Sequence, residues 1–264
     1  MTEAAAIARS SEPITKERLL TDFRKIGLST GQIVLVHASM SRMGWVCGGA
    51  RTVIESLLEA IGPKGTLVMP AQSFEYSDPA SWYDPTLPED WWDTIRNNIP
   101  AFDPHLSPTR NMGIIAETFR LWPHTLRSNH PQASFTAQGP EAAHILAHHP
   151  LEDPFGLTSP LGKLYKLNAS ILMIGTHWDT CTGLHLAERI AYPEQDNFED
   201  ATAMLIDGQR KWVHFKMPRT NKECFSLLGT KLDQQTFIRH GHIGYAPTRL
   251  VSMPAAIDMA AGML

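Results

Sequence analysis

The 264-residue chain has few cysteines, no excess of basic residues and no long apolar run. Its three cysteines form no CxxC pair, which argues against a disulfide framework or a cysteine zinc site and fits a reducing compartment. Lys and Arg total 23 against 27 for Asp and Glu, whereas a nucleic-acid-binding protein normally carries a basic surplus. No stretch approaches the length of a membrane span, and the N-terminus lacks the pattern of a signal peptide. We therefore expect a soluble cytoplasmic protein without nucleic-acid or membrane partners.

Several catalytic motifs are also absent. Neither GxGxxG nor GxxxxGK[ST] occurs, so nucleotide hydrolysis and Rossmann-type binding lose support. No GxSxG elbow surrounds Ser39 or any other serine, which argues against a serine hydrolase. His144, His148 and His149 are close in sequence but lack an HExxH context and an obvious third ligand. We expect no metal site.

The chain does contain a clear strand–helix–strand unit. Residues 33–36 and 66–69 are short apolar runs, typical of strands buried on both faces. Between them, apolar residues of 53–61 repeat with helical spacing. Such a unit joins parallel strands by a right-handed crossover.

An antiparallel element is predicted further along. Residues 204–206 and 212–215 flank Asp207-Gly208, a turn sequence typical of a hairpin. The two signals together predict an α/β fold, with one domain over residues 15–264 and a mixed, partly parallel central sheet flanked by helices. We expect residues 1–14 to form a flexible segment. Further helices are predicted after Thr15, up to Gly27, and at residues 112–121, 140–148 and 183–191, and a further strand at residues 170–174.

The first candidate site is the glycine-containing loop between the strand at 33–36 and the next helix. Backbone N–H groups at such a helix start suit a phosphate or pyrophosphate, because small residues let the ligand approach closely. The alternative is a connecting loop without a ligand.

The second candidate is the pair His185 and Glu188, three residues apart on a predicted helix. Thr182 as N-cap would place His185 in the first turn, where the helix dipole disfavours imidazolium, while the carboxylate can fix the ring tautomer. A neutral imidazole is what a general base needs. The alternative is an ordinary ion pair on a partly exposed helix.

The third candidate is a loop-rich insertion over residues 70–108. Within residues 71–103 there are seven acids against one base, Arg96, and seven of the 22 aromatic residues of the chain. Residues 188–200 add five acids against Arg189. Acids and aromatic rings together would attract and stack a polycationic sugar-like ligand, although a solvated acidic face is the alternative. The first window contains the acids Glu75, Asp78, Asp84, Glu89, Asp90, Asp93 and Asp103 and the aromatic residues Phe74, Tyr76, Trp82, Tyr83, Trp91, Trp92 and Phe102.

Six segments, from about Thr15 to Met259, resemble the aminoglycoside 3-N-acetyltransferases in both sequence and order. They read VLVHASMSRMGWVCGG, EAIGPKGTLVMPAQSF, FDPHLSPTRNMG, RSNHPQASFTAQGP, DPFGLTSPLGKLYKL and TGLHLAE. The resemblance implies an enzyme that uses acetyl-CoA, needs no metal and acetylates the 3-amino group of the antibiotic's deoxystreptamine ring, conferring resistance.

The resemblance also implies roles for single residues. The family's histidine and acid fall on His185 and Glu188, which makes His185 the general base of a direct transfer. Its coenzyme-binding segments fall on His37, Ser39, Met40, Arg42, Met43, Gly44, Trp45, Val46, Ser107, Arg110 and Gly113. Ala38 replaces a frequent serine, so one hydroxyl contact to the coenzyme is in doubt.

The acceptor site is the variable part of the family, and its residues are predicted from the acids and aromatic residues of this sequence. We expect it at Glu75, Tyr76, Asp78, Asp93, Asp153 and Asp179. Two alternatives stay open: acetylation of a different amine, biosynthetic or nucleotide-like, and a protein that binds a cationic ligand without turnover.

Overall fold

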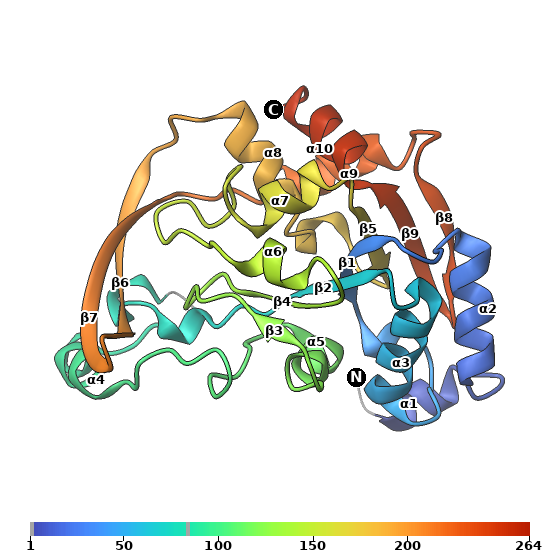
Figure 1. The fold of residues 1–264 in the computed structure, drawn as a ribbon, viewed down its shortest axis with the longest axis horizontal. Helices are drawn as coiled ribbons and strands as arrows, with labels where there is room; N and C mark the ends of the chain where they lie inside the picture. Colours follow the sequence, from blue (N-terminus) through green and yellow to red (C-terminus); the bar gives the residue numbers. More distant parts are fainter. Residues whose placement is uncertain (1–2, 83–84) are drawn as a thin grey trace.

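A seven-stranded sheet crosses the middle of the molecule in the order β3-β4-β2-β1-β5-β9-β8 (Figure 1). The computed structural model describes residues 3–82 and 85–264, so Tyr83 and Asp84 of the insertion lie outside the described residues. The central strands β1 (Ile33–Ala38), β2 (Thr66–Pro70) and β5 (Ser170–Ile174) are parallel. Antiparallel strands flank them, so the mixed α/β sheet is confirmed. These strands are β3 (Leu126–Arg127), β4 (Phe135–Gln138), β8 (Arg239–Ile243) and β9 (Ala246–Ser252).

Helices cover both faces of the sheet, as the buried strands require. Along β1, Val34 and Val36 pack on one face, whereas Leu35 packs on the other, because side chains alternate along a strand. The face of Val34 and Val36 carries α2 (Lys16–Ile26), α3 (Gly49–Ile61) and α5 (Gly113–Arg120). The face of Leu35 carries α6 (Ala142–Leu146), α7 (Pro160–Lys166), α8 (Leu184–Ala191), α9 (Phe225–Leu232) and α10 (Met253–Ala261).

The first predicted helix is present with both of its ends. The Thr15 hydroxyl accepts a hydrogen bond from the backbone N–H of Arg18, which satisfies a free donor of the first turn of α2. Gly27 ends the helix at φ +97°, a conformation that favours glycine. The β1–α3–β2 crossover is present as well.

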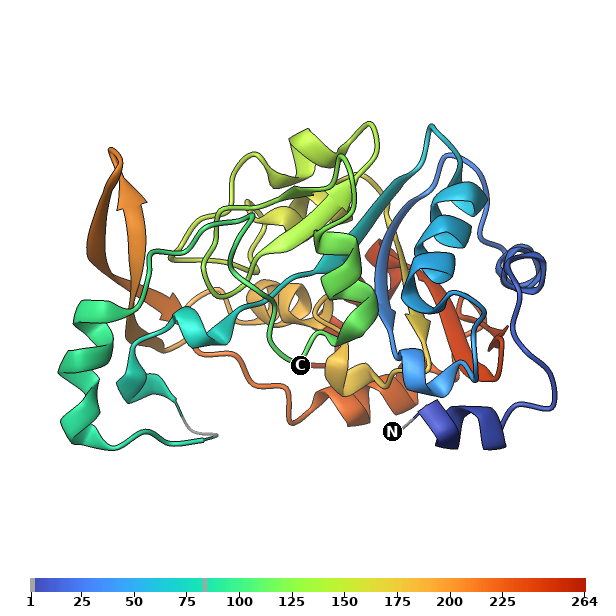
Figure 2. The same cartoon turned by 90° about the horizontal axis from the view of Figure 1, so that it is seen from below.

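The predicted hairpin exists but does not belong to the central sheet. Strands β6 (Asn197–Ile206) and β7 (Gln209–Pro218) form a separate two-stranded sheet at one end of the molecule (Figure 2). The turn at Asp207-Gly208 is as predicted, with positive φ at both residues. The antiparallel strands of the main sheet instead come from β3–β4 and from the β8–β9 hairpin, which the sequence analysis missed.

The insertion folds against this hairpin. It contains α4 (Trp92–Asn98) and the short 3₁₀ helices η2 (Phe74–Tyr76), η3 (Pro79–Ser81) and η4 (Glu89–Trp91). The guanidinium of Arg210 on β7 donates hydrogen bonds to the carbonyls of Arg96 and Ile99, and the N–H of Phe102 binds the carbonyl of Ala203. The irregular segment is therefore held by the arm formed by β6 and β7.

The N-terminal residues, expected to form a flexible segment, contain helix α1 (Glu3–Ala8). Ser10 Oγ accepts the N–H of Trp45, Glu3 Oε1 accepts the indole N–H of the same residue, and Ile14 pairs with Val46. These contacts attach the segment to the loop that follows β1. None of the helices within residues 3–82 and 85–264 has the length and apolarity needed to cross a membrane.

Candidate active site

A cleft of about 1320 Å³ opens where the three parallel strands end. Val36 to Ser41 of the β1 end, Met69 and Pro70 of the β2 end and Thr176 beyond β5 line it. Ligands of open α/β sheets bind beyond the carboxyl ends of the strands, because the connecting loops and helix N-termini converge there. The cleft is therefore the candidate active site.

Two helix N-termini form one end of the cleft. Gly48 and Gly49 at the start of α3, and Gly113 at the start of α5, line it with positive φ values of 78°, 62° and 82°. No acidic residue lies in the first turn of either helix. A Cβ atom on Gly49 would meet no atom within 4 Å, so open space adjoins the main chain. These features suit a phosphate group, which binds the free N–H groups and the positive end of the helix dipole.

Arg110 adds a positive charge to the same end and lines the cleft. Its N–H donates to the carbonyl of Gln72, and its guanidinium lies 5.1 Å from the ring centre of Trp82.

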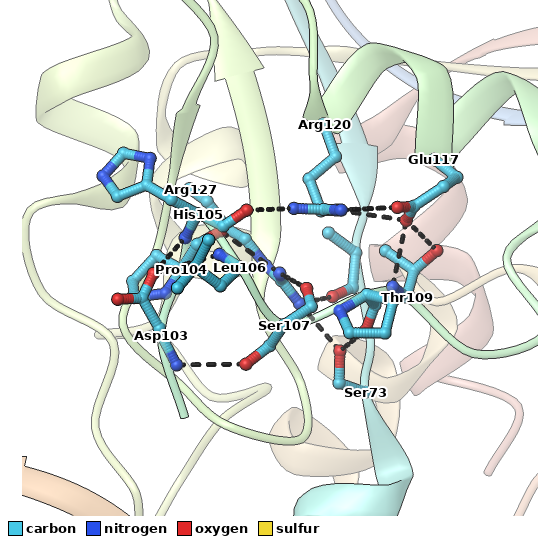
Figure 3. A network of polar contacts seen from close by, with 12 residues as sticks. Ser73, Asp103, Pro104, His105, Leu106, Ser107, Thr109, Glu117, Arg120 and Arg127 are labelled. Atoms are coloured by element: carbon cyan, nitrogen blue, oxygen red, sulfur yellow. Dashed lines mark hydrogen bonds and ion pairs between the residues drawn. The ribbon is translucent and has the colours of Figure 1, made fainter. Parts of the chain in front are cut away.

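A network of polar contacts holds the segment that precedes Arg110 (Figure 3). Arg127 Nη1 donates to the carbonyls of Pro104 and Ser107, while Glu117 accepts the N–H and the hydroxyl of Thr109. Burial lowers the pKa of Arg127 to about 10. This value is still well above neutral pH, so the guanidinium stays cationic. The network therefore fixes the main chain from which Arg110 extends.

The predicted coenzyme residues divide into two groups. Arg42 is exposed outside the cleft lining, Met43 is fully buried in the core, and Ser107 belongs to the network around Arg127, with its hydroxyl bound by the N–H of Asp103. Sequence could not separate these residues, because the 3₁₀ turn η1 (Met40–Arg42) decides which side chains of the loop face the cleft. The residues that line the cleft are His37, Ser39, Met40, Gly44, Trp45, Val46, Arg110 and Gly113.

Gly44 has a packing role in addition to its place in the cleft. Its φ is +89°, and a Cβ atom there would lie 2.5 Å from the ring of Tyr245 and 2.7 Å from Ser10 Oγ. Both the backbone conformation and the close approach of the N-terminal segment require glycine.

His185 lies in the first turn of α8, on the other face of the sheet from α3 and α5, and lines the cleft. Its Nδ1 atom is 2.6 Å from Oε2 of Glu188, and the other carboxylate oxygen accepts the N–H of Asn221 at 2.8 Å. With Nδ1 donating to the carboxylate, Nε2 is an acceptor, which is the tautomer that a general base needs. Gly183 rather than Thr182 occupies the N-cap, and no side chain caps the helix.

Two aromatic rings hold the imidazole in place. The ring of Phe155 stacks on His185 with centroids 4.8 Å apart and an angle of 23°, and Phe225 lies 4.9 Å away. Asp153 accepts an ion pair from Arg189 at 3.0 Å, which joins the segment of Phe155 to α8. Asp153 itself does not line the cleft.

Of the predicted acceptor residues, only Asp179 lines the cleft. Arg96 binds Asp78 at 2.8 Å and Asp93 at 3.1 Å. Burial opposes the ionisation of Asp78, but the bonds from Arg96 and from the N–H of Ala80 hold its pKa below the ordinary value. Glu75 and Tyr76 lie in η2, with Tyr76 buried against Phe102. The insertion thus binds its single arginine internally.

Other residues of the cleft were missed. Buried Asp200 on β6 accepts from the N–H of Asp78 and from the amide of Gln132, and burial raises its pKa. Only its place in the acidic run 188–200 pointed to it. Further lining residues include Glu3, Phe74, Trp82, Gln132, Thr176, Phe198 and Met217. Across residues 3–82 and 85–264, no three His, Cys, Asp or Glu side chains come together to hold a metal ion.

Comparison with known proteins gives consistent matches over most of the chain. A family model described as aminoglycoside 3-N-acetyltransferase matches residues 35–264. The SPbeta prophage-derived aminoglycoside N(3')-acetyltransferase-like protein YokD of Bacillus subtilis (strain 168) is 42% identical, over 94% of this chain and 91% of that protein. Aminoglycoside N(3)-acetyltransferase IX of Micromonospora chalcea is 38% identical, over 98% and 96%.

Solved structures agree. The crystal structure of YokD matches with a TM-score of 0.96 and 39% identity, over 98% of this chain and 96% of that one. The structure of AAC-IIIb binary with CoASH matches with a TM-score of 0.86 and 30% identity, over 96% of each chain.

Proposed function

Since the chain belongs to the aminoglycoside 3-N-acetyltransferase family and is an acyltransferase that uses acetyl-CoA, we propose that it acetylates the 3-amino group of aminoglycosides, with His185 as the general base. Such a modification would confer resistance to the antibiotic. The observation that carries the proposal is the His185–Glu188 pair, whose histidine lines the same cleft as the glycine-rich ends of α3 and α5.

The arrangement of the cleft supports a direct transfer. Nε2 of His185 takes a proton from the amine as the amine nitrogen bonds to the thioester carbonyl carbon, and Glu188 stabilises the imidazolium that forms. The C–S bond then breaks, and the departing thiolate takes the proton that His185 holds, so that the products are the amide and free coenzyme A and the imidazole is again neutral. Phe155 and Glu188 keep the ring from turning, which lowers the entropic cost of reaching the reactive geometry.

The end of the cleft at α3 and α5 is proposed to bind the coenzyme phosphates. The N–H groups at the starts of α3 and α5 offer hydrogen bonds, and Arg110 offers charge. Ser39, Met40, Trp45 and Val46 would line the path of the coenzyme from these phosphates toward His185.

One observation favours a second acceptor class, an amine with fewer positive charges. Three of the acids predicted for the acceptor site do not line the cleft: Asp78, Asp93 and Asp153 are instead bound by arginines. The cleft lining contains the carboxylates of Asp179 and the hydrogen-bonded Asp200, together with the apolar Phe74, Phe198 and Met217.

Thiol release from acetyl-CoA, measured with a panel of aminoglycosides and simpler amines, tests the proposal. Turnover with 3-amino aminoglycosides, and loss of that turnover when a substrate lacking the 3-amine is used, would support it. Turnover only with other amines would favour the second class. Binding of aminoglycosides without thiol release would overturn the proposed reaction.

A further inference from the structure

Three residues that line the cleft have a buried polar atom with no hydrogen-bond partner among the described residues. One atom is Nε1 of Trp82 in the insertion, and the other two lie at the ends of neighbouring strands of the sheet and take no part in the proton transfer above. These two are Nε2 of His37, at the end of β1, and Oγ1 of Thr176, beyond the end of β5. Burying a polar group without a hydrogen-bond partner is costly, so such groups in native proteins are normally bound by protein, water or ligand atoms. Because His37 and Thr176 lie at the ends of adjacent parallel strands, both are at the same edge of the sheet, where a polar ligand group can satisfy them.

The sheet brings both residues to the part of the cleft between the phosphate end and His185. β1 and β5 are parallel neighbours, and their pairing continues to the N–H of Ser39, which binds the carbonyl of Ile174. His37 is two residues after Leu35, and side chains two apart on a strand share a face. That face is the one covered by α8, which carries His185, whereas α3 and α5 cover the other face.

A coenzyme that reaches from α3 and α5 to His185 must therefore cross the ends of the strands. Its reactive thioester arrives at the α8 side of the sheet, where His37 lies. On the proposed function, the group that needs donors at this place is the thioester carbonyl, whose oxygen becomes negative when the amine attacks.

The main chain of the loop after β1 offers few donors for this oxygen. The N–H groups of Ser39, Arg42, Met43 and Trp45 already bind Ile174, Ser39, Met40 and Ser10, respectively. Side-chain donors can therefore supplement the remaining N–H groups of the loop.

We propose that His37, through Nε2–H, and Thr176, through its hydroxyl, donate hydrogen bonds to the thioester carbonyl oxygen and stabilise the oxyanion of the tetrahedral intermediate. This proposal rests on the proposed acyl transfer but not on the identity of the amine. The oxygen gains negative charge as the C–N bond forms and returns to a carbonyl as the C–S bond breaks, so neither donor loses its proton.

The environment of His37 suits a neutral donor. The residue is only 7% exposed, and burial lowers its pKa to about 4. The imidazole therefore stays neutral at working pH and does not compete with His185 for the proton of the amine. Donors held in a water-poor site stabilise a developing oxyanion without reorganising.

The test uses two pairs of variants. Thr176→Val and His37→Leu remove the hydrogen-bond donor at their position, whereas Thr176→Ser and His37→Gln each keep a donor there. Thr202→Val is the matched control, because Thr202 also has a buried unpaired hydroxyl but does not line the cleft. Removing either donor should lower kcat by about 10²–10³-fold. The affinity for coenzyme A, which has no thioester carbonyl, should change less than about twofold. The conservative variants should recover at least about a tenth of the wild-type kcat.

A second readout needs no acceptor. The C=O stretch of [1-¹³C]acetyl-CoA bound to the wild type should lie below its value in water, and it should move back upward in Thr176→Val and His37→Leu. An unchanged stretch in both variants, or an unchanged kcat in variants that melt like the wild type, would overturn the proposal. So would a loss confined to coenzyme A affinity. If no aminoglycoside is acetylated, the proposed function fails, while the stretch still decides the role of these donors.

Discussion

Nδ1 of His185 lies 2.6 Å from Oε2 of Glu188, three residues later on α8, and the second oxygen of that carboxylate is bound by the N–H of Asn221. Glu188 is buried, so its charge is compensated by the hydrogen bonds that it accepts. The same carboxylate thus orients the imidazole and is itself held by the segment before α9.

Replacing His185 with Ala should lower kcat by about 10²–10⁴-fold with little change in the affinity for either substrate, because a general base acts in the transition state. Glu188→Gln should also lower kcat, by about 10²-fold or more, since a neutral amide does not stabilise an imidazolium. Steady-state kinetics measure both effects. His144→Ala, at an exposed histidine outside the cleft, serves as the control. More than about a tenth of wild-type turnover in His185→Ala would contradict the assignment.

Gly44→Val should raise the KM for acetyl-CoA and lower the melting temperature. Valine is strained at φ +89°, and its Cβ would displace Tyr245 and Ser10, which hold the loop after β1. Gly31→Val separates the effect of backbone strain from that of displaced neighbours. Gly31 also has a positive φ, +85°, but a Cβ atom there would meet no atom within 4 Å. An equal KM for acetyl-CoA in both variants would show that the position of this loop does not matter for coenzyme binding.

Asp179→Asn should raise the KM for an aminoglycoside and leave that for acetyl-CoA unchanged, because Asp179 lines the cleft. The effect should shrink as salt rises, since exposed charges are screened over about 8 Å at physiological ionic strength. Asp93→Asn is the matched control: its side chain is 89% exposed and lies outside the cleft lining. Equal changes in the two variants would indicate a general field of the surface and not a contact in the site.

Stability should fall as pH is lowered from about 6.5 toward 4. Burial lowers the pKa of His130 from 6.5 to about 4, so in this range the unfolded chain takes up a proton that the folded chain does not. The contribution of His130 to the free energy of unfolding is complete above pH 6.5 and is lost progressively below it. It amounts to at most about 3 kcal/mol.

Urea unfolding at pH 7.5 and pH 5 measures this effect. In the wild type, Nδ1 of His130 accepts hydrogen bonds from the N–H groups of Gln132 and Ala133. His130→Asn removes the titrating ring but offers an amide oxygen that can accept in place of Nδ1. The variant should therefore lose less stability than the wild type between the two pH values. An identical pH dependence would show that His130 is not buried as a neutral ring in solution.

Local features of this protein were predictable because the interactions that produce them lie within a few residues. The cap of Thr15 on Arg18, the end of α2 at Gly27 and the turn at Asp207-Gly208 depend on neighbouring residues alone. The β1–α3–β2 crossover follows from apolar periodicity. The place of His185 and Glu188 on one helix face follows from their spacing of three, and so does the contact that they make.

What only the tertiary structure decided is how distant segments meet. Strands β8 and β9 were missed because β8 contains Arg239 and His240 and lies at the edge of the sheet, where polar side chains reach solvent. Acids of the insertion were predicted to form the acceptor site, yet Asp78 and Asp93 make ion pairs with Arg96 of the same insertion. Charge in a sequence predicts attraction but not which partner neutralises it. That partner, like the side of the loop that Met43 faces, is set by packing between residues far apart in the chain.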